Sequence, residues 1–283
     1  MVYNKHIVVV GSARSGTSWL AEVLARPHRY RLLFEPEHEF NTPKGHLLCD
    51  RWIASKEEAG PEAHRYLKKV FANRVDNDWI AQHSNRKWKR HLWPFIPKKY
   101  IIKFVRCNLS ASYIANTFHI PVVHVVRDPF EVIASQQRVK FPWLYDLSRF
   151  QQQPNLVKAL QEHFQIDITH LEAYSKVALL TLRWGIENCL PKVMHPSNLE
   201  GYTWISHQQL REDISLFQKL CNTHQLEVAP NLETWYRKPS SKAHPRGMKG
   251  NAVDGERNAL QSNEEVLSLL DKFQYKSLLK DVL

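Results

Sequence analysis

The sequence has only four cysteines among its 283 residues, and their spacing excludes the sites that cysteine usually signals. Cys49, Cys107, Cys189 and Cys221 lie far apart and form no C-x-x-C pair, so the sequence predicts neither a disulfide framework nor a zinc knuckle. The fifteen histidines include no H-E-x-x-H pattern, which would be the mark of a catalytic zinc site. We therefore expect reduced thiols and no metal ion.

Several other features that would assign the chain to a special class are also missing. The sequence contains no low-complexity tract, no obvious internal repeat and no apolar run of about 18 residues that could span a membrane. A strand-like run begins by residue 6, which leaves no room for a secretion signal. We expect one globular domain over residues 1–283 that stays in the cytosol and has no membrane partner.

The chain has more basic than acidic residues. The 39 lysines and arginines outnumber the 28 aspartates and glutamates, which gives a formal net charge of +11. Such a balance favours an anionic substrate, a nucleic acid or an acidic surface as the partner. Charge alone does not choose among them.

A motif with the spacing of a phosphate-binding loop follows the first hydrophobic run, where residues 8–20 read VVVGSARSGTSWL. Gly11 and Gly16 are spaced as in G-x-x-x-x-G-K-[ST], whose backbone N–H groups point at phosphates while its lysine reaches the β and γ groups. Here Thr17 takes the place of the lysine, and Arg14 lies inside the loop. The pattern indicates an anion-binding loop without the lysine that phosphoryl transfer from ATP requires.

Apolar runs of strand length alternate with stretches of helical periodicity along the chain. Strands are predicted at residues 6–11, 30–36, 100–105, 121–127 and 202–206. Helices are predicted from residue 17 to residue 27, at 108–118, and in the later half at 155–165, 169–189, 207–222 and 264–280. Short apolar strands separated by helices favour an α/β fold with three layers (α/β/α), a central parallel P-loop-like sheet and a mostly helical C-terminal half.

Charged residues stand at the ends of three of these strands. Arg14 follows the first strand, Glu35 ends the second, and Arg127 ends the strand at 121–127. Ligands of open α/β sheets bind beyond the carboxyl ends of the strands. Ser135, eight residues after Arg127 on the helix that follows, completes a second site suited to phosphate. Two anion sites predict a ligand with an anionic group at each end.

The two motifs together resemble those of sulfotransferases that depend on 3′-phosphoadenosine 5′-phosphosulfate (PAPS). That family has a [KR]-S-G-T-[ST] loop and an R-[DN]-P-x-x-[VA]-x-x-S segment, which correspond here to residues 14–18 and 127–135. The sequences around Glu35 and Lys103, and those at 183–188, 207–214 and 262–273, also occur in the order of the family. The resemblance covers most of the chain, and residues 40–99 are its least explained part.

The resemblance implies that the chain uses PAPS as co-substrate, without a metal, and releases 3′-phosphoadenosine 5′-phosphate (PAP). Arg14 would lie against the bridging oxygen and the departing 5′-phosphate, and Arg127 with Ser135 would hold the 3′-phosphate. The 5′-phosphate would be held by the remainder of the loop, which comprises Ser15, Gly16, Thr17 and Ser18.

The resemblance also suggests an adenine site. Trp19 matches an aromatic residue that stacks on adenine in related enzymes, although its helical position also suits a core residue. His207 occupies an aromatic position of the family near adenine. Arg246 and Gly247 lie in the basic stretch 237–250, where relatives close a loop over the nucleotide, but a merely solvated basic loop has the same composition.

The acceptor must lose a proton as it attacks, so a general base is expected near the sulfur. Cytosolic relatives often use a histidine two residues after the lysine that corresponds to Lys103, but here that position is Val105. In other branches a glutamate after the second strand has this role, and Glu35 directly follows the apolar run. Three nearby residues remain alternatives, namely Glu37, His38 and Glu39. Lys103 is expected either to steady the leaving 5′-phosphate or to pair with a carboxylate.

Residues 40–99 are expected to form an insertion on the acceptor side of the cleft. Within it, residues 79–100 interleave tryptophans with lysines and arginines, a pattern that suits a lid over an apolar acceptor, an anionic sugar polymer or a nucleic acid. The leading interpretation is a sulfotransferase for a small-molecule or carbohydrate acceptor, with no nucleic-acid partner. A P-loop kinase of a small molecule or nucleotide is the alternative, and a basic nucleic-acid-binding protein is a distant third.

Overall fold

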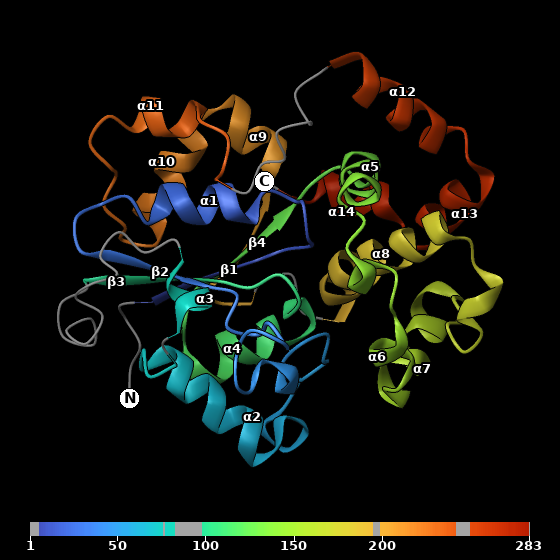
Figure 1. Ribbon diagram of the computed structural model, residues 1–283, viewed down its shortest axis with the longest axis horizontal. Helices are drawn as coiled ribbons and strands as arrows, with labels where there is room; N and C mark the ends of the chain where they lie inside the picture. The colour runs from blue at the N-terminus through green and yellow to red at the C-terminus, as the bar shows by residue number, and fades with distance from the viewer. Residues whose placement is uncertain (1–5, 76, 83–97, 195–198, 242–249, 283) are drawn as a thin grey trace.

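A parallel five-stranded sheet forms the centre of the computed structural model, which describes residues 6–75, 77–82, 98–194, 199–241 and 250–282 (Figure 1). The strand order is β2-β3-β1-β4-β5, and every neighbouring pair is parallel. The five predicted strands are confirmed as β1 (His6–Val10), β2 (Tyr30–Phe34), β3 (Lys99–Lys103), β4 (Val122–Val126) and β5 (Tyr202–Ser206). Both faces of the sheet are covered, as near-continuous apolar strands require.

Helices cover the sheet on both faces and produce the predicted three layers (Figure 1). Side chains alternate along β1, so Ile7 and Val9 pack on one face and Val8 and Val10 on the other. The first face carries α1 (Thr17–Leu24), α9 (His207–Glu212), α10 (Ile214–Thr223) and α11 (Leu232–Arg237). The second face carries α2 (Lys56–Phe71), α3 (Asp78–Ala81) and α4 (Ala111–Phe118), with the short η1 (Gly45–Leu47) and η3 (Asn108–Ser110) nearby in sequence.

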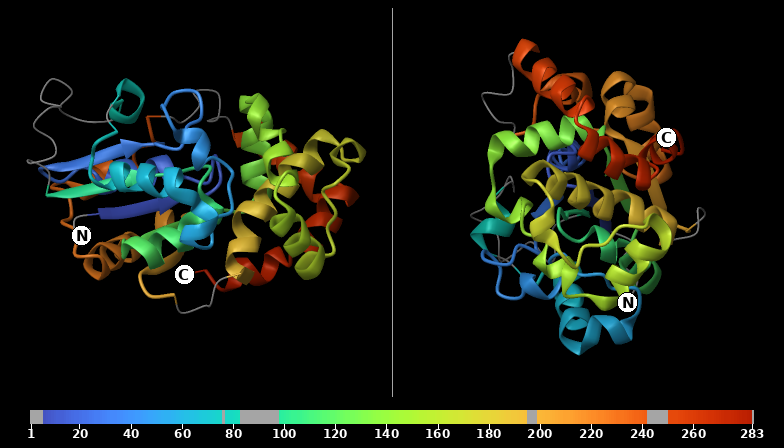
Figure 2. Two further views of the ribbon diagram at one scale, coloured as in Figure 1. Left: turned by 90° about the horizontal axis from the view of Figure 1, so that it is seen from below. Right: turned by 90° about the vertical axis from the view of Figure 1, so that its right-hand side faces the viewer.

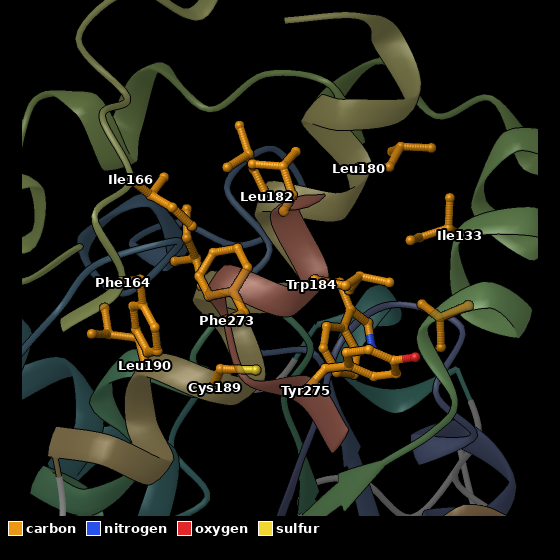
Figure 3. Close-up of a cluster of buried hydrophobic side chains, with 14 of the residues drawn as sticks. Ile133, Phe164, Ile166, Leu180, Leu182, Trp184, Cys189, Leu190, Phe273 and Tyr275 are labelled. Carbon is orange, nitrogen blue, oxygen red and sulfur yellow. The ribbon is translucent and has the colours of Figure 1, made fainter. Parts of the chain in front are cut away.

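A third apolar core lies beside the sheet, within the helical C-terminal half that the sequence predicts (Figures 2 and 3). Trp184 is buried in this core, and Gly185 beside it lets its helix, α8 (Lys176–Met194), approach Phe273, because a Cβ there would lie 2.2 Å from the phenyl ring. The elements of this half are α5 (Pro129–Val139), η4 (Pro142–Leu144), α6 (Ser148–Gln151), α7 (Pro154–Phe164), η5 (Leu171–Ala173), α8 (Lys176–Met194), α12 (Gly250–Gln261), α13 (Glu264–Lys272) and α14 (Tyr275–Lys280).

Several helices differ from the bounds that periodicity predicts. The helix expected from residue 17 to residue 27 ends at Leu24, and the one expected at 108–118 begins with η3. The helix expected at 169–189 begins at Lys176, after η5. The helix expected at 207–222 is divided at Asp213, whose extended backbone ends α9 and whose carboxylate caps α10 by accepting from Ser215 N at 2.8 Å. The helix expected at 264–280 is divided at Gln274, which adopts φ 54°. Within the part of the chain that the structure describes, no helix combines the length and apolar character needed to cross a membrane.

Candidate functional site

The loop between β1 and α1 is fixed by bonds to the helices behind it. Asn188 of α8 donates to Ser12 Oγ at 2.7 Å, and Gln136 of α5 donates to the carbonyl of Ala13 at 2.9 Å. Three residues of the loop have positive φ, namely Gly11 at 153°, Arg14 at 74° and Gly16 at 97°. A non-glycine residue in this region is strained by about 1–2 kcal/mol, and such strain is concentrated at functional sites. The loop is therefore held in a defined shape at the carboxyl end of β1.

Three arginines gather at this loop. Arg14 Nε donates to Ser135 Oγ at 3.0 Å, and Arg127 donates to the carbonyl of Arg14 at 3.3 Å and to Glu131 at 2.7 Å. Burial lowers the pKa of Arg14, and the charges of Arg127 and Arg138 lower it further. The structure thus brings together Arg14, Arg127 and Ser135, although Ser135 contacts Arg14 and does not line the cavity described next.

The start of α5 fixes the position of Arg127. Asp128 caps this helix by accepting from Glu131 N at 3.1 Å, and Pro129 occupies the first helical turn. Arg138 was not singled out from the sequence, although its spacing gives a signal: it follows Ser135 by three residues and so shares a face of α5.

A cavity of about 550 Å³ opens in front of these groups, at the carboxyl edge of the sheet. Its basic side includes Arg14, Gly16, Thr17, Ser18 and Arg127. Another part of its lining is aromatic and includes Phe34, Phe40, Trp79, Phe141 and Trp143. Ser15 is outside this lining; its Oγ is buried and has no hydrogen-bond partner among the described residues.

Glu35 and Lys103 form an ion pair at the ends of β2 and β3. Their side chains are 16% and 2% exposed, and Glu35 N also donates to the carbonyl of Lys103 at 2.9 Å. Glu35 has φ 44°, so the chain turns sharply as it leaves β2. Both residues line the cavity, with Lys103 Nζ 4.3 Å from the ring centre of Phe34. Of the two sequence expectations for Lys103, pairing with a carboxylate is observed.

Glu37 is the most deeply buried carboxyl group of the cavity. It is 1% exposed, and its Oε1 accepts from Val105 N at 2.6 Å and Arg106 N at 3.1 Å. Its Oε2 is buried and has no hydrogen-bond partner among the described residues. Burial raises the pKa of Glu37 to about 7, and the neighbouring charge of Glu35 contributes.

The other two alternatives for the base, Glu39 and His38, already interact with neighbouring side chains or backbone groups. Glu39 forms ion pairs with Arg106, at 2.7 Å, and with Arg149. His38 packs against Trp79 with ring centres 4.4 Å apart, and its Nδ1 accepts from the backbone of residues 40 and 41. Burial lowers the pKa of His38, which favours its neutral form. Only the tertiary structure reveals the role of Arg106, which also pairs with buried Asp50.

Trp19 and His207 lie together beside the loop and also line the cavity. Trp19 is 5% exposed, its Nε1 donates to the carbonyl of Tyr236 at 3.1 Å, and its ring meets His207 edge-on at 5.7 Å. Trp19 is thus part of the core between α1 and α11 while still lining the cavity. Burial, with the charges of Arg127 and Arg211, lowers the pKa of His207 to about 3. Its ring lies against Gly16, where a Cβ would come within 2.1 Å.

Some sequence predictions fall outside the described residues. These are Arg246 and Gly247 and most of the stretch 79–100. Among the described residues, no group of three or more His, Cys, Asp or Glu side chains could hold a metal ion.

Comparison with known proteins gives structural likenesses only. No family model and no curated protein matches the chain. Solved structures that it resembles include a sulfotransferase from Alicyclobacillus acidocaldarius, with 14% identity, 95% of each chain covered and a TM-score of 0.38. Another is sulfotransferase STF9 from Mycobacterium avium, with 12% identity over 99% of this chain and 77% of that one and a TM-score of 0.47.

A third is mouse sulfotransferase SULT7A1 complexed with PAP, with 14% identity over 94% of this chain and 74% of that one and a TM-score of 0.36. All three carry the name of the family that the sequence motifs resemble.

Proposed function

We propose that this chain is a sulfotransferase that moves the sulfuryl group of PAPS to a hydroxyl or amine of a small-molecule or carbohydrate acceptor. The observation that carries the proposal is the group of guanidinium groups at the β1–α1 loop. Arg14 is half-buried near Arg127 and Arg138, and its burial, together with the charges of these two arginines, lowers the pKa of Arg14. An anion bound among the three guanidinium groups would offset their positive charge and accept hydrogen bonds from them.

The residues of the loop fit a phosphosulfate better than a nucleoside triphosphate. Thr17 replaces the lysine that reaches the β and γ groups of ATP, and Arg14 supplies the cation from within the loop. When bound, PAPS supplies a sulfuryl group whose transfer leaves the 5′-phosphate of PAP. Arg14, Thr17, Ser18 and the loop N–H groups would hold that 5′-phosphate, and Ser15 Oγ, which has no partner among the described residues, is a further donor.

Arg127 supports the 3′-phosphate assignment from its place at the start of α5. It donates to Glu131 and to the loop carbonyl of Arg14, so one side chain joins the two predicted anion sites. Ser135 reaches the site through Arg14 and is a positioning residue in this arrangement. Beside the loop, Trp19 and neutral His207 are the aromatic residues that we propose to contact adenine.

Glu35 is our proposal for the general base. Its carboxylate lines the cavity at the end of β2, whereas Glu37 is held by two backbone N–H groups and Glu39 by two arginines. The acceptor O–H or N–H would give its proton to Glu35 as its heteroatom bonds to sulfur. The bond from sulfur to the 5′-phosphate oxygen would break, and the electron pair would remain on that oxygen. Lys103, paired with Glu35, holds the carboxylate in place and adds positive charge near the reacting groups.

The aromatic side of the cavity favours an acceptor with an apolar or sugar face. Phe40 and Trp79 come from residues 40–99, which supports the proposal that this segment forms the acceptor side within one domain. Phe141 and Trp143 follow α5 and stack on each other with ring centres 6.4 Å apart. The four cysteines are buried and form no disulfides, a state typical of reducing compartments, which supports the cytosol as the proposed location.

The decisive experiment compares nucleotides by thermal unfolding without added metal. PAP should raise the melting temperature by roughly 5 to 10 °C at about 100 times its Kd, and ADP by much less, because PAP alone has groups for both anion sites. Arg127→Ala should weaken PAP binding, whereas Arg237→Ala, at an exposed arginine outside the cavity, should not. Equal stabilisation by ADP and PAP would contradict the proposal and favour the kinase alternative.

A further inference from the structure

A second, smaller cavity of about 260 Å³ lies next to the loop that borders the first. The loop at residues 36–44 lines both cavities: Glu37, His38 and Phe40 line the first, and Pro43 and Lys44 line the second. The remaining lining comes from α2 and the segment before α3, namely Glu62, Arg65, Tyr66, Lys69, Arg74, Val75 and Asn77. Figure 1 shows α2 and α3 on the same side of the sheet.

The second cavity has an excess of positive charge that its own residues do not balance. Lys44 pairs with Glu62 at 3.2 Å, which accounts for the only carboxylate among its lining residues. Arg65 and Lys69 stand four residues apart on α2, a spacing at which like charges repel, and Arg74 adds a third cation. Within the described residues, none of these three forms an ion pair.

Hydrogen bonds join the walls of the two cavities. Tyr66, buried on α2, donates to the carbonyl of Pro36 at 2.8 Å, one residue after Glu35. Asn77 donates to the carbonyl of Asn41 at 2.8 Å, and its Oδ1 caps α3, which carries Trp79 of the first cavity. The relative position of the two cavities is therefore fixed by secondary structure on both sides of the loop.

The separation of the cavities has an upper limit set by the chain. Glu37 and Pro43 are six positions apart in the sequence, and six positions span at most about 22 Å when the chain is fully extended. Between them lies Phe40, whose side chain is 82% exposed and lines the first cavity. An elongated molecule can therefore contact the reactive end of the first cavity, the aromatic surface and the second cavity together.

We propose that the second cavity binds a second anionic group of the acceptor, a sulfate or a phosphate ester, remote from the atom that is sulfated. The inference rests on the proposed function, because it names the class of acceptor that the first cavity receives. Arg65 and Lys69 bind this group, and Arg74 adds a further contact. Acceptors with such a group bind more tightly than their neutral counterparts, and the preference falls as salt concentration rises.

The test measures binding to PAP-saturated protein by fluorescence anisotropy. Two labelled pairs serve as probes: a tetrasaccharide with and without a sulfate group, and a biphenyl alcohol with and without a terminal phosphate ester. Inorganic phosphate is a separate competitor that represents a free anion. The variant Arg65→Glu/Lys69→Glu reverses the charge of the cavity, and Lys68→Glu is the matched control, because Lys68 is exposed on the same helix but lines neither cavity.

We expect the anionic member of at least one pair to bind about tenfold more tightly than its neutral form, and the double variant to remove this preference. Lys68→Glu should change it less than twofold. The inference is wrong if neither pair shows a preference, if Lys68→Glu weakens binding as much as the double variant does, or if millimolar phosphate displaces the neutral member of a pair as readily as the anionic one. PAP should still stabilise the double variant against thermal unfolding as much as it stabilises the parent protein. If the proposed function itself is wrong, PAP should not stabilise even the parent protein, so the two failures can be told apart.

Discussion

Glutamine in place of Glu37 would remove a carboxyl group that the fold holds in an unfavourable setting. Burial raises the pKa of Glu37 from its ordinary value of 4.5 to about 7. Between these two pH values the folded state holds a proton that the unfolded state has lost, so the free energy of unfolding falls as pH rises. The two pKa values differ by about 2.5, and each pH unit of difference corresponds to about 1.4 kcal/mol. The free energy of unfolding should therefore fall by ~3 kcal/mol between pH 4.5 and pH 7.

Urea unfolding from pH 4.5 to pH 8 should reveal this loss. The free energy of unfolding of Glu37→Gln, measured relative to the parent protein, should rise by ~3 kcal/mol across that range, because glutamine does not ionise. Any constant cost of the amide cancels from this change, since Gln Oε1 retains the bonds from Val105 N and Arg106 N while its NH₂ takes the place of the unpartnered Oε2. Glu233→Gln, at an exposed glutamate of α11, is the control and should stay within about 0.5 kcal/mol of the parent at every pH. A pH-independent difference for Glu37→Gln would refute the assignment of a buried, protonated carboxyl group beside Glu35.

Two further substitutions test the loop and the base. Gly16→Ala should destabilise the protein by ~1–3 kcal/mol more than Gly60→Ala in thermal unfolding and should weaken PAP binding. Both glycines have positive φ, but only at Gly16 would the Cβ strike a neighbour, His207 at 2.1 Å; equal losses for the two variants would contradict the clash. Glu35→Gln should lower turnover at saturation by roughly 10² to 10⁴ with PAP affinity preserved, and near-normal turnover on a true acceptor would end the assignment of Glu35 as base.

The sequence predicts those parts of the site whose positions follow from the spacing of nearby residues. Glycine spacing and the apolar run before it predict the loop after β1, and the rule that parallel strands end at one edge brings Arg14, Glu35 and Arg127 to the same place. The same reasoning does not predict a role for Arg106, because its neighbours in the sequence do not indicate that it pairs with Asp50 and Glu39.

The choice of a general base among the acidic residues at 35–39 also depends partly on sequence and partly on tertiary structure. Their spacing places all of them after β2, but hydrogen bonds to the backbone after β3 bury Glu37, and arginines from two other segments neutralise Glu39. Burial and pairing depend on residues about 70 to 110 positions away in the chain. A sequence pattern describes neighbours within a few residues, so it could not separate these carboxyl groups.

Strand positions, the parallel sheet, the three layers and the position of the loop after β1 were determined by the sequence alone, because each follows from apolar periodicity or from residue spacing within one segment. Only the tertiary structure decided where the helix predicted at 207–222 divides, which cations lie next to Arg14, and that a second basic cavity adjoins the first. The physical reason is the range of the interactions. Backbone conformation and apolar periodicity act over a few residues, whereas desolvation and charge act through space between segments that only the folded chain brings together.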